Sequence, residues 1–233
     1  MRWNFSSRAR ELSGADAIVI SIPKSGRTWA RTFLNAYFAY KKGKQFALNF
    51  TDRSEAGVPR IVYSHDRFED RTKGNGWDRL RGKYLIPYRS LRQVPIVLLA
   101  RDPRDAFVSY FVQLTRRNPA TPGEIKELAI SDLLRHPRFG IAAMVEVMNG
   151  WLEEFGDRSH FSIVRYEELR ADPPRAFHEL LRAIGEKEID DAVFGPALDF
   201  SDFRNMQKLE AAGEFRSKIL QPRDREDPET FKV

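Results

Sequence analysis

The clearest pattern along the chain is a set of four short runs centred on valine, isoleucine and leucine, at residues 17–22, 60–64, 95–101 and 161–166. The first reads Ala-Ile-Val-Ile-Ser-Ile and lacks the strict alternation of a strand with one face in water. Runs of this kind are typical of parallel strands that are buried on both faces. The pattern therefore predicts four strands of one parallel sheet.

Between these runs, apolar residues recur every three or four positions, which is the spacing of a helix with one buried face. Four such segments start near Thr28, Pro103, Ile141 and Asp172. Lys-Lys-Gly-Lys at 41–44 is expected to end the first, and Gly185 the last. Strands that alternate with helices predict an α/β fold, a single-domain parallel sheet flanked by helices with right-handed crossovers.

Length and composition narrow the class of protein. The chain has 233 residues, 42% of them apolar, and no cysteine, which predicts one domain over residues 1–233. The lack of cysteine excludes disulfide scaffolds, thiolate metal sites and a cysteine nucleophile, and it fits a reducing compartment. No apolar run approaches the roughly 20 residues of a membrane span, and residues 1–10 contain no apolar signal core. We therefore expect a cytoplasmic protein without a membrane span.

The net charge of +6 and the pI near 9.6 suit an anionic ligand, a nucleic acid or an anionic membrane surface equally well. The arginines are spread along the whole chain and form no basic block. Charge alone therefore does not choose among these partners.

Polar segments directly follow three of the predicted strands, where ligands of open α/β sheets bind. They are Pro23-Lys24-Ser25-Gly26-Arg27-Thr28-Trp29, Ser64-His65-Asp66 and Arg101-Asp102-Pro103-Arg104-Asp105. The first has the parts of an anion-binding loop, with a glycine, a lysine, two hydroxyls and the amides of a helix N-terminus. It is not a Walker A loop, because that motif needs a second glycine and a lysine directly before the hydroxyl residue.

These segments resemble the motifs of PAPS-dependent sulfotransferases of the cytosolic, bacterial-like type, where PAPS is 3′-phosphoadenosine 5′-phosphosulfate. Residues 23–29 are similar to the family's 5′-phosphosulfate loop, with Arg27 in place of the usual threonine. Arg101, with Ser109 eight positions later, is similar to its 3′-phosphate segment. Residues 165–168 resemble its tyrosine-acid segment and residues 201–206 its adenine-side segment. Together with His65, these motifs run in the family's order from residue 17 to about 210 and imply a P-loop-like sulfotransferase fold.

The resemblance implies in-line transfer of a sulfuryl group from PAPS to an acceptor hydroxyl or amine, with no metal. Its catalytic residues would be Lys24, which stabilises the leaving phosphate, His65, which takes the acceptor's proton, and Ser109. Among the four histidines, only His65 follows a predicted strand beside the anion loop. The implied cofactor-binding residues are Lys24, Ser25, Gly26, Arg27, Thr28, Trp29, Arg101, Ser109, Tyr166, Ser201, Phe203 and Met206.

Two positions depart from the family's pattern. An arginine-rich, glycine-containing loop usually closes over the 3′-phosphate, and nothing in residues 213–233 looks like it. We therefore expect this C-terminal clamp to be missing or truncated, with Arg204 or Arg216 as the first candidates to replace it. Tyr63 stands where many members have a lysine two residues before the histidine, so one sulfonate contact is expected to be absent.

Other functions are weighed against this one. A P-loop-like nucleotide kinase shares the sheet and the anion loop but needs a Walker lysine and Mg²⁺ ligands, which the sequence does not show. A nucleic-acid-binding module needs a known DNA or RNA motif, and none is present. The acceptor is expected to be a small molecule, and several aromatic residues hint that it is apolar or aromatic: Phe46, Phe50, Phe68, Trp77 and Tyr88. The oligomeric state is not readable from the sequence.

Overall fold

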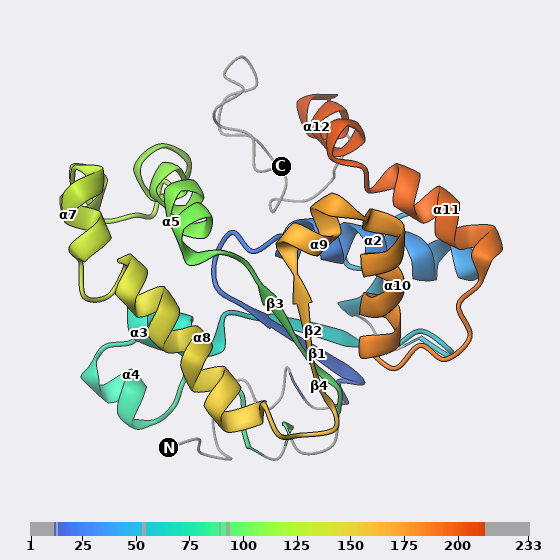
Figure 1. The fold of residues 1–233 in the computed structure, drawn as a ribbon, viewed down its shortest axis with the longest axis horizontal. Helices are drawn as coiled ribbons and strands as arrows, with labels where there is room; N and C mark the ends of the chain where they lie inside the picture. The colour runs from blue at the N-terminus through green and yellow to red at the C-terminus, as the bar shows by residue number, and fades with distance from the viewer. Residues whose placement is uncertain (1–11, 13, 53–54, 89, 92–93, 213–233) are drawn as a thin grey trace.

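The computed structural model describes residue 12 and residues 14–52, 55–88, 90–91 and 94–212 (Figure 1). Its strands form one parallel sheet in the order β2-β1-β3-β4. They are β1 (Ala17–Ser21), β2 (Ile61–Ser64), β3 (Ile96–Ala100) and β4 (Phe161–Arg165). Each strand end lies within one residue of the predicted run, so the prediction of four parallel strands is confirmed.

Helices connect the strands and cover both faces of the sheet (Figure 1). They are α2 (Arg27–Lys41), α3 (Asp66–Lys73), α4 (Gly76–Leu80), α5 (Pro103–Val112), α6 (Gly123–Lys126), α7 (Ile130–Arg135), α8 (Ile141–Phe155), α9 (Tyr166–Ala171), α10 (Pro173–Ala183), α11 (Asp191–Phe200) and α12 (Phe203–Ala212). A 3₁₀ turn, η1 (Phe50–Asp52), and a π-helical turn, η2 (Gln113–Arg117), complete them. The four helices predicted from apolar spacing are α2, α5, α8 and α10, which confirms those predictions.

The predicted signals at helix ends form real caps. The carboxylate of Asp102 accepts a hydrogen bond of 2.9 Å from the backbone N–H of Arg104 at the start of α5. Asp172 does the same for the N–H of Arg175 in α10, at 3.2 Å. Gly185, with φ of +94°, follows α10 in the left-handed conformation that glycine adopts most easily. Local sequence therefore sets where these helices start and stop.

The sheet separates two hydrophobic cores, because side chains along a strand point alternately to its two faces. Ile18 and Ile20 of β1 pack with α3, α5 and α8 on one face. Ala17 and Val19 of the same strand pack with α2 and α10 on the other. All five residues of β1 are buried, as expected for a strand in the middle of a sheet covered on both sides.

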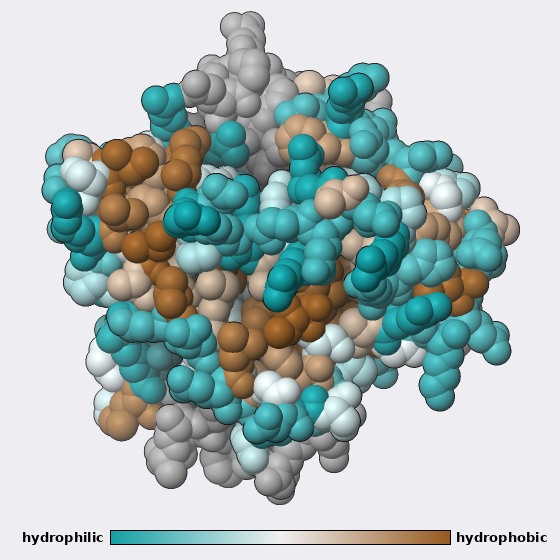
Figure 2. Space-filling view, in the orientation of Figure 1, coloured by the Kyte–Doolittle hydropathy of each residue, from teal (hydrophilic) through white to brown (hydrophobic). Residues whose placement is uncertain are grey.

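The edge strand β4 is less covered than β1. Ile163 is 45% exposed, and Leu152 of α8 is 40% exposed. Figure 2 shows apolar surface on this side of the molecule over β4 and the neighbouring helices, and a second apolar area over α5 and α7. Of the helices in the described ranges, none combines the length and the apolar character that crossing a membrane requires.

Replacing Phe33 tests the core beneath α2. Its ring is fully buried, and the ring centroid lies 4.2 Å from that of Phe177 and 5.5 Å from that of Phe194. We expect Phe33→Ala to lower the free energy of unfolding by about 3–5 kcal/mol, because it leaves a cavity among these rings. Urea unfolding measures this change. The control Leu80→Ala, at a site 60% exposed, should change the value by only about 0.5 kcal/mol.

Candidate active site

The carboxyl ends of the four strands meet at one edge of the sheet, and the strand register decides which residues become neighbours. Ile20 pairs with Ser64, so His65 follows β2 beside Ser21 of β1. Ala100 pairs with Arg165, so Arg101 follows β3 next to the residue after β4. Segments far apart in the sequence are thereby brought together in the way that ligand sites of open α/β sheets require.

The loop between β1 and α2 has the geometry of an anion-binding turn. Lys24 and Gly26 both have positive φ, +68° and +82°, and Gly26 is the N-cap residue of α2. Among the described residues, no side chain caps the helix there. The backbone N–H groups of its first turn point toward the loop and carry the positive end of the helix dipole.

The ring of Tyr166 closes against this loop. A Cβ atom added to Gly26 would lie 2.7 Å from Cδ2 of Tyr166, so the close approach itself requires glycine. The guanidinium of Arg101 lies 4.1 Å from the centroid of the same ring and donates a hydrogen bond of 2.8 Å to the carbonyl of Lys24. Trp29 meets Tyr166 edge-on, with ring centroids 6.3 Å apart. Residues from three elements thus hold the turn in one shape.

Three buried polar atoms around this loop have no hydrogen-bond partner in the part of the chain that the structure describes. They are Oγ of Ser25, Nε1 of Trp29 and Nε of Arg101. Each can donate a hydrogen bond, and buried donors in proteins are rarely left unpaired. This set of donors fits a ligand rich in oxygen acceptors.

His65 lies at the N-terminus of α3, with its ring turned toward β1. Its Nδ1 is 2.6 Å from the carbonyl oxygen of Ser21 and 3.4 Å from the hydroxyl oxygen of the same residue. A carbonyl oxygen only accepts hydrogen bonds, so the short contact places the imidazole proton on Nδ1. In the neutral ring, Nε2 then carries the lone pair, and it can accept a proton.

The other three histidines have structural surroundings. His160 contacts the carbonyl of Leu91 through Nε2 at 3.0 Å, and His178 packs on the ring of Phe194 with centroids 4.1 Å apart. A ring nitrogen of His136 accepts hydrogen bonds from two backbone N–H groups of its own loop. Of the four, His65 is the one that the fold places at the carboxyl edge of the sheet.

Of the residues expected on the adenine side, Met206 lies next to Trp29. Met206 is buried with Leu48, and Trp29 packs against this pair. Phe203 is 37% exposed, and the guanidinium of Arg170 lies 5.7 Å from its ring centroid. The sequence did not single out Arg170, because no local motif marks a contact between α9 and α12.

The remaining predicted residues lie on the surrounding elements. Ser201 is buried and donates from its hydroxyl to the carbonyl of Leu198, at 3.1 Å, as it ends α11. Ser109 is half-buried in α5, and Arg27 and Thr28 are half-buried in the first turn of α2. The segment expected to lack a 3′-phosphate clamp, residues 213–233, lies outside the described residues, and so does Arg216.

Acidic residues at this edge support the backbone. Asp102 caps α5, and the hydrogen-bonded guanidinium of Arg104 holds the pKa of its carboxyl at about 2. Oε1 of Glu167 accepts a hydrogen bond of 2.9 Å from the backbone N–H of Asp102 and so joins the ends of β3 and β4. In the described ranges, no three His, Cys, Asp or Glu side chains come together as possible metal ligands.

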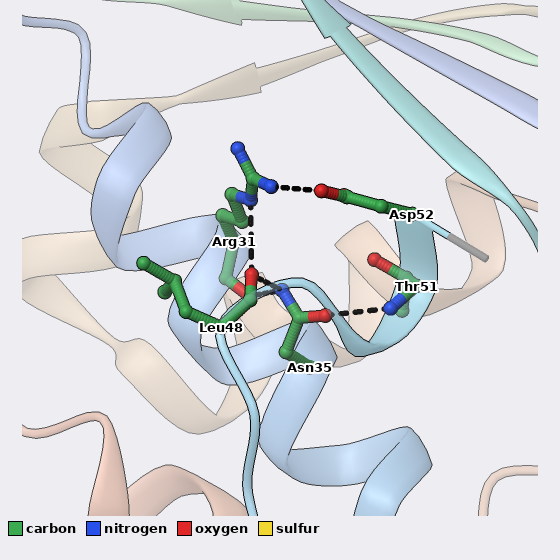
Figure 3. A network of polar contacts seen from close by, with 5 residues as sticks. All are labelled: Arg31, Asn35, Leu48, Thr51 and Asp52. Atoms are coloured by element: carbon green, nitrogen blue, oxygen red, sulfur yellow. Dashed lines mark hydrogen bonds and ion pairs between the residues drawn. The ribbon is translucent and has the colours of Figure 1, made fainter. Parts of the chain in front are cut away.

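A polar network fixes the chain after α2 (Figure 3). Asn35 is fully buried; it donates to the carbonyl of Leu48 at 3.0 Å and accepts from the N–H of Thr51 at 2.7 Å. Arg31 also donates to Leu48, at 3.2 Å, and is ion-paired with Asp52. The network holds residues 48–52 against α2, so that Leu48 packs with Met206, one of the residues expected on the adenine side.

Tyr63, at the position where the resemblance implies a lysine in many members, also borders this network. The guanidinium of Arg31 lies 5.1 Å from the centroid of its ring. Burial raises the pKa of the Tyr63 hydroxyl, so the side chain stays neutral. The cation next to this position therefore comes from α2 and is balanced by Asp52.

The aromatic residues that hinted at the acceptor do not form one surface. Phe46 packs on Phe200, with centroids 4.5 Å apart, and Phe68 is buried in the core against Tyr110. Trp77 is 63% exposed on α4. Aromatic residue type alone therefore did not identify an acceptor pocket, because most of these rings serve the core.

Comparison with known proteins leads to the same family that the sequence motifs resemble. The sequence model of the sulfotransferase domain family matches residues 15–227. No curated protein sequence matches the chain. The fold is similar to that of mouse sulfotransferase SULT7A1 complexed with PAP, at a TM-score of 0.57 and 19% identity over 83% of this chain and 66% of that one.

It is also similar to two structures of retinol dehydratase with PAP. The complex with retinol gives a TM-score of 0.58 and 16% identity, covering 87% of this chain and 70% of that one. The complex with androsterone gives a TM-score of 0.54 and 14% identity, covering 86% of this chain and 69% of that one. The chain thus spans about two thirds of the length of these proteins, and the likeness confirms the expected P-loop-like sulfotransferase fold. With the family's sequence model matching nearly the whole described range, the chain belongs to the sulfotransferase domain family.

Proposed function

We propose that the protein transfers a sulfuryl group from PAPS to the hydroxyl or amine of a small-molecule acceptor, by in-line displacement with His65 as general base. Membership of the sulfotransferase family supports the reaction class. The lack of cysteine supports a cytoplasmic place of action.

The observation that carries this proposal is the set of unpartnered donors at the β1–α2 loop. Leaving a buried hydrogen-bond donor unpaired costs about 1–3 kcal/mol of stability. An unpaired donor in a native protein therefore calls for an explanation, and a ligand that accepts its hydrogen bond is one. Ser25 Oγ and Arg101 Nε are buried donors that suit phosphate or sulfate oxygens, and the N–H of Trp29 adds a third. The residues present therefore fit a ligand with a phosphosulfate group.

Lys24 and the first turn of α2 would hold the 5′-phosphosulfate. The ammonium of Lys24, the amides after Gly26 and the helix dipole all favour negative charge at this point. The charge that grows on the leaving phosphate during transfer is stabilised by the same groups. Such preorganised electrostatic stabilisation is often the largest contribution to catalysis. PAPS itself supplies the activated sulfuryl group.

His65 would accept the proton of the attacking group. Its Nδ1–H donates to the carbonyl of Ser21, so in the neutral ring the lone pair stands on Nε2, the atom that would take the acceptor's hydroxyl or amine proton. As the acceptor oxygen or nitrogen bonds to sulfur, the bond between sulfur and the phosphate oxygen breaks, and the proton passes to Nε2. General-base catalysis of this kind contributes about 10²- to 10⁴-fold.

The test is release of adenosine 3′,5′-bisphosphate (PAP) from PAPS in the presence of candidate acceptors. Because retinol dehydratase was crystallised with retinol and with androsterone, apolar alcohols are the first to try, followed by phenols, amines and sugars. Acceptor-dependent release supports the proposal. Binding of ATP with Mg²⁺, or of an oligonucleotide, in preference to PAP would contradict it.

Replacing His65 separates catalysis from cofactor binding. We expect His65→Ala to lower turnover by about 10²- to 10⁴-fold, because the general base is lost. The affinity for PAP, measured by calorimetry, should stay within a factor of about two, since the ring is held by Ser21 at the end of β1 and is expected to face the acceptor. His136→Ala is the matched control and should turn over normally. Full activity of His65→Ala would remove this residue from the mechanism.

Arg101 is expected to recognise the 3′-phosphate. Losing one charge-assisted hydrogen bond costs about 1.5–3 kcal/mol, so Arg101→Ala should weaken PAP binding roughly 10- to 150-fold. Binding of adenosine 5′-phosphosulfate, which has no 3′-phosphate, should weaken much less. Arg104→Ala, three residues further on at the start of α5 and 81% exposed, is the control. Equal losses for both nucleotides would mean that Arg101 acts only through its contacts with Tyr166 and Lys24.

Gly26 and Gly43 offer a matched pair for the anion loop. Both have positive φ, +82° and +64°, so alanine at either costs about 1–2 kcal/mol of backbone strain. Only at Gly26 does the new Cβ meet a neighbour, the ring of Tyr166 at 2.7 Å; at Gly43 nothing lies within 4 Å. We expect Gly26→Ala to weaken PAP binding at least tenfold and Gly43→Ala to leave it unchanged. Equal affinities in the two variants would show that the loop tolerates displacement.

A further inference from the structure

An unusual backbone conformation stands directly after His65. Within the described residues, the non-glycine residues with positive φ are Lys24 and Asp66, the latter at +38°. Lys24 belongs to the anion loop, but nothing in the proposed mechanism accounts for Asp66. Strained residues persist only where their surroundings hold them, and they concentrate at functional sites.

The side chain of Asp66 is anchored at both oxygens. It is fully buried; Oδ1 accepts a hydrogen bond of 2.8 Å from the backbone N–H of Ile86, and Oδ2 accepts one of 2.9 Å from Nε1 of Trp151. Its own backbone N–H donates to Oγ of Ser64, at 2.8 Å. Three bonds from three parts of the chain thus fix one residue of the β2–α3 turn.

Burying a carboxylate is costly, and an apolar residue at this position would avoid that cost. Aspartate suits the turn for two reasons: it tolerates the left-handed conformation better than most residues, and its two oxygens satisfy two separated donors. The hydrogen bond reaches across the core to α8, where Trp151 is the largest fully buried side chain among the described residues. The chain direction at His65 is therefore set by a contact 85 residues away.

The ring of His65 has two constraints. Its Nδ1 is held by the carbonyl of Ser21 on β1, and its backbone leads directly into the turn that Asp66 anchors. With both ends fixed, the direction of Nε2 is also fixed. If the turn relaxed, the ring would tilt away from Ser21 and both tautomers would become populated.

We propose that Asp66 is the positioning residue of His65: its buried carboxylate, bound to Ile86 and Trp151, keeps Nδ1 on Ser21 and Nε2 turned toward the acceptor. The inference rests on the proposed function only in treating His65 as the base. Asp66 itself touches no substrate, and its role is confined to the geometry of the turn.

Asp66→Asn is the sharpest test, because asparagine has the same shape and tolerates the same backbone. Its NH₂ group must face either the N–H of Ile86 or that of Trp151, so one of the two bonds is lost. In protein labelled with ¹⁵N-histidine at pH 8, we expect His65 of the unmutated chain to hold its proton on Nδ1 and that of the variant to show a tautomer mixture. Turnover should fall about ten- to a hundredfold, with PAP affinity unchanged.

Asp78→Asn is the matched control. Asp78 lies on α4 and is also nearly buried, at 7% exposure. Its carboxylate pairs with Arg81 and Lys83, which follow that helix, and none of its contacts in the described chain is with the β2–α3 turn. The same chemical change there should leave the His65 tautomer and turnover as they were. If Asp66→Asn does not fold, Trp151→Phe removes one of the two donors and is judged by the same measurements.

The readouts distinguish this inference from the proposed function. Unchanged tautomer and turnover in Asp66→Asn would overturn the positioning role. A loss of PAP affinity equal to the loss of turnover would also overturn it, because it would indicate general damage to the site. If His65→Ala remained active, the general-base proposal would fail, while the tautomer measurement would still report whether Asp66 orients the ring.

Discussion

The hydrogen-bond register between the parallel strands is the constraint on which the rest of this site depends. Ile20 opposite Ser64 puts His65 beside the Ser21 carbonyl, and Ala100 opposite Arg165 puts Arg101 beside Tyr166. A shift of one residue in a strand would turn its side chains to the opposite face of the sheet. The alternation of Ala17, Ile18, Val19 and Ile20 between two filled cores opposes such a shift, so core packing indirectly holds the chemistry in place.

The same edge of the sheet carries several unfavourable local features of the described residues. Lys24 and Asp66 have positive φ, and Ser25, Trp29 and Arg101 have buried donors without partners in the described chain. Each feature costs about 1–3 kcal/mol, which is a large part of a typical domain's 5–15 kcal/mol of stability. These features gather at one edge, which is the distribution expected where binding, and not folding alone, has shaped the sequence.

The sequence predicted the strands, the main helices and their caps, because these depend on residues close together in the chain. The run at 17–22, the Asp172-Pro-Pro start and Gly185 each specify their own local structure. The positions of the motifs after the strands followed from the fold class. What the sequence did not reveal depends on distant partners, such as Trp151 for Asp66 and Phe203 for Arg170. The places of the aromatic residues also depend on distant partners: Phe46 packs on Phe200 and Phe68 on Tyr110, and no local pattern records these contacts.

The two halves of the proposed site are supported by different layers of the molecule. The anion loop leads into α2, and Trp29 packs against Phe177 of α10, on one face of the sheet. The turn that carries His65 leads into α3 and is tied to Trp151 of α8, on the other face. Changes in the α2–α10 layer should therefore act first on cofactor binding, and changes in the α3–α8 layer on proton transfer from the acceptor. The bond between His65 and Ser21 joins the β2–α3 turn to the end of β1, directly before the anion loop, so it links the two halves of the proposed site.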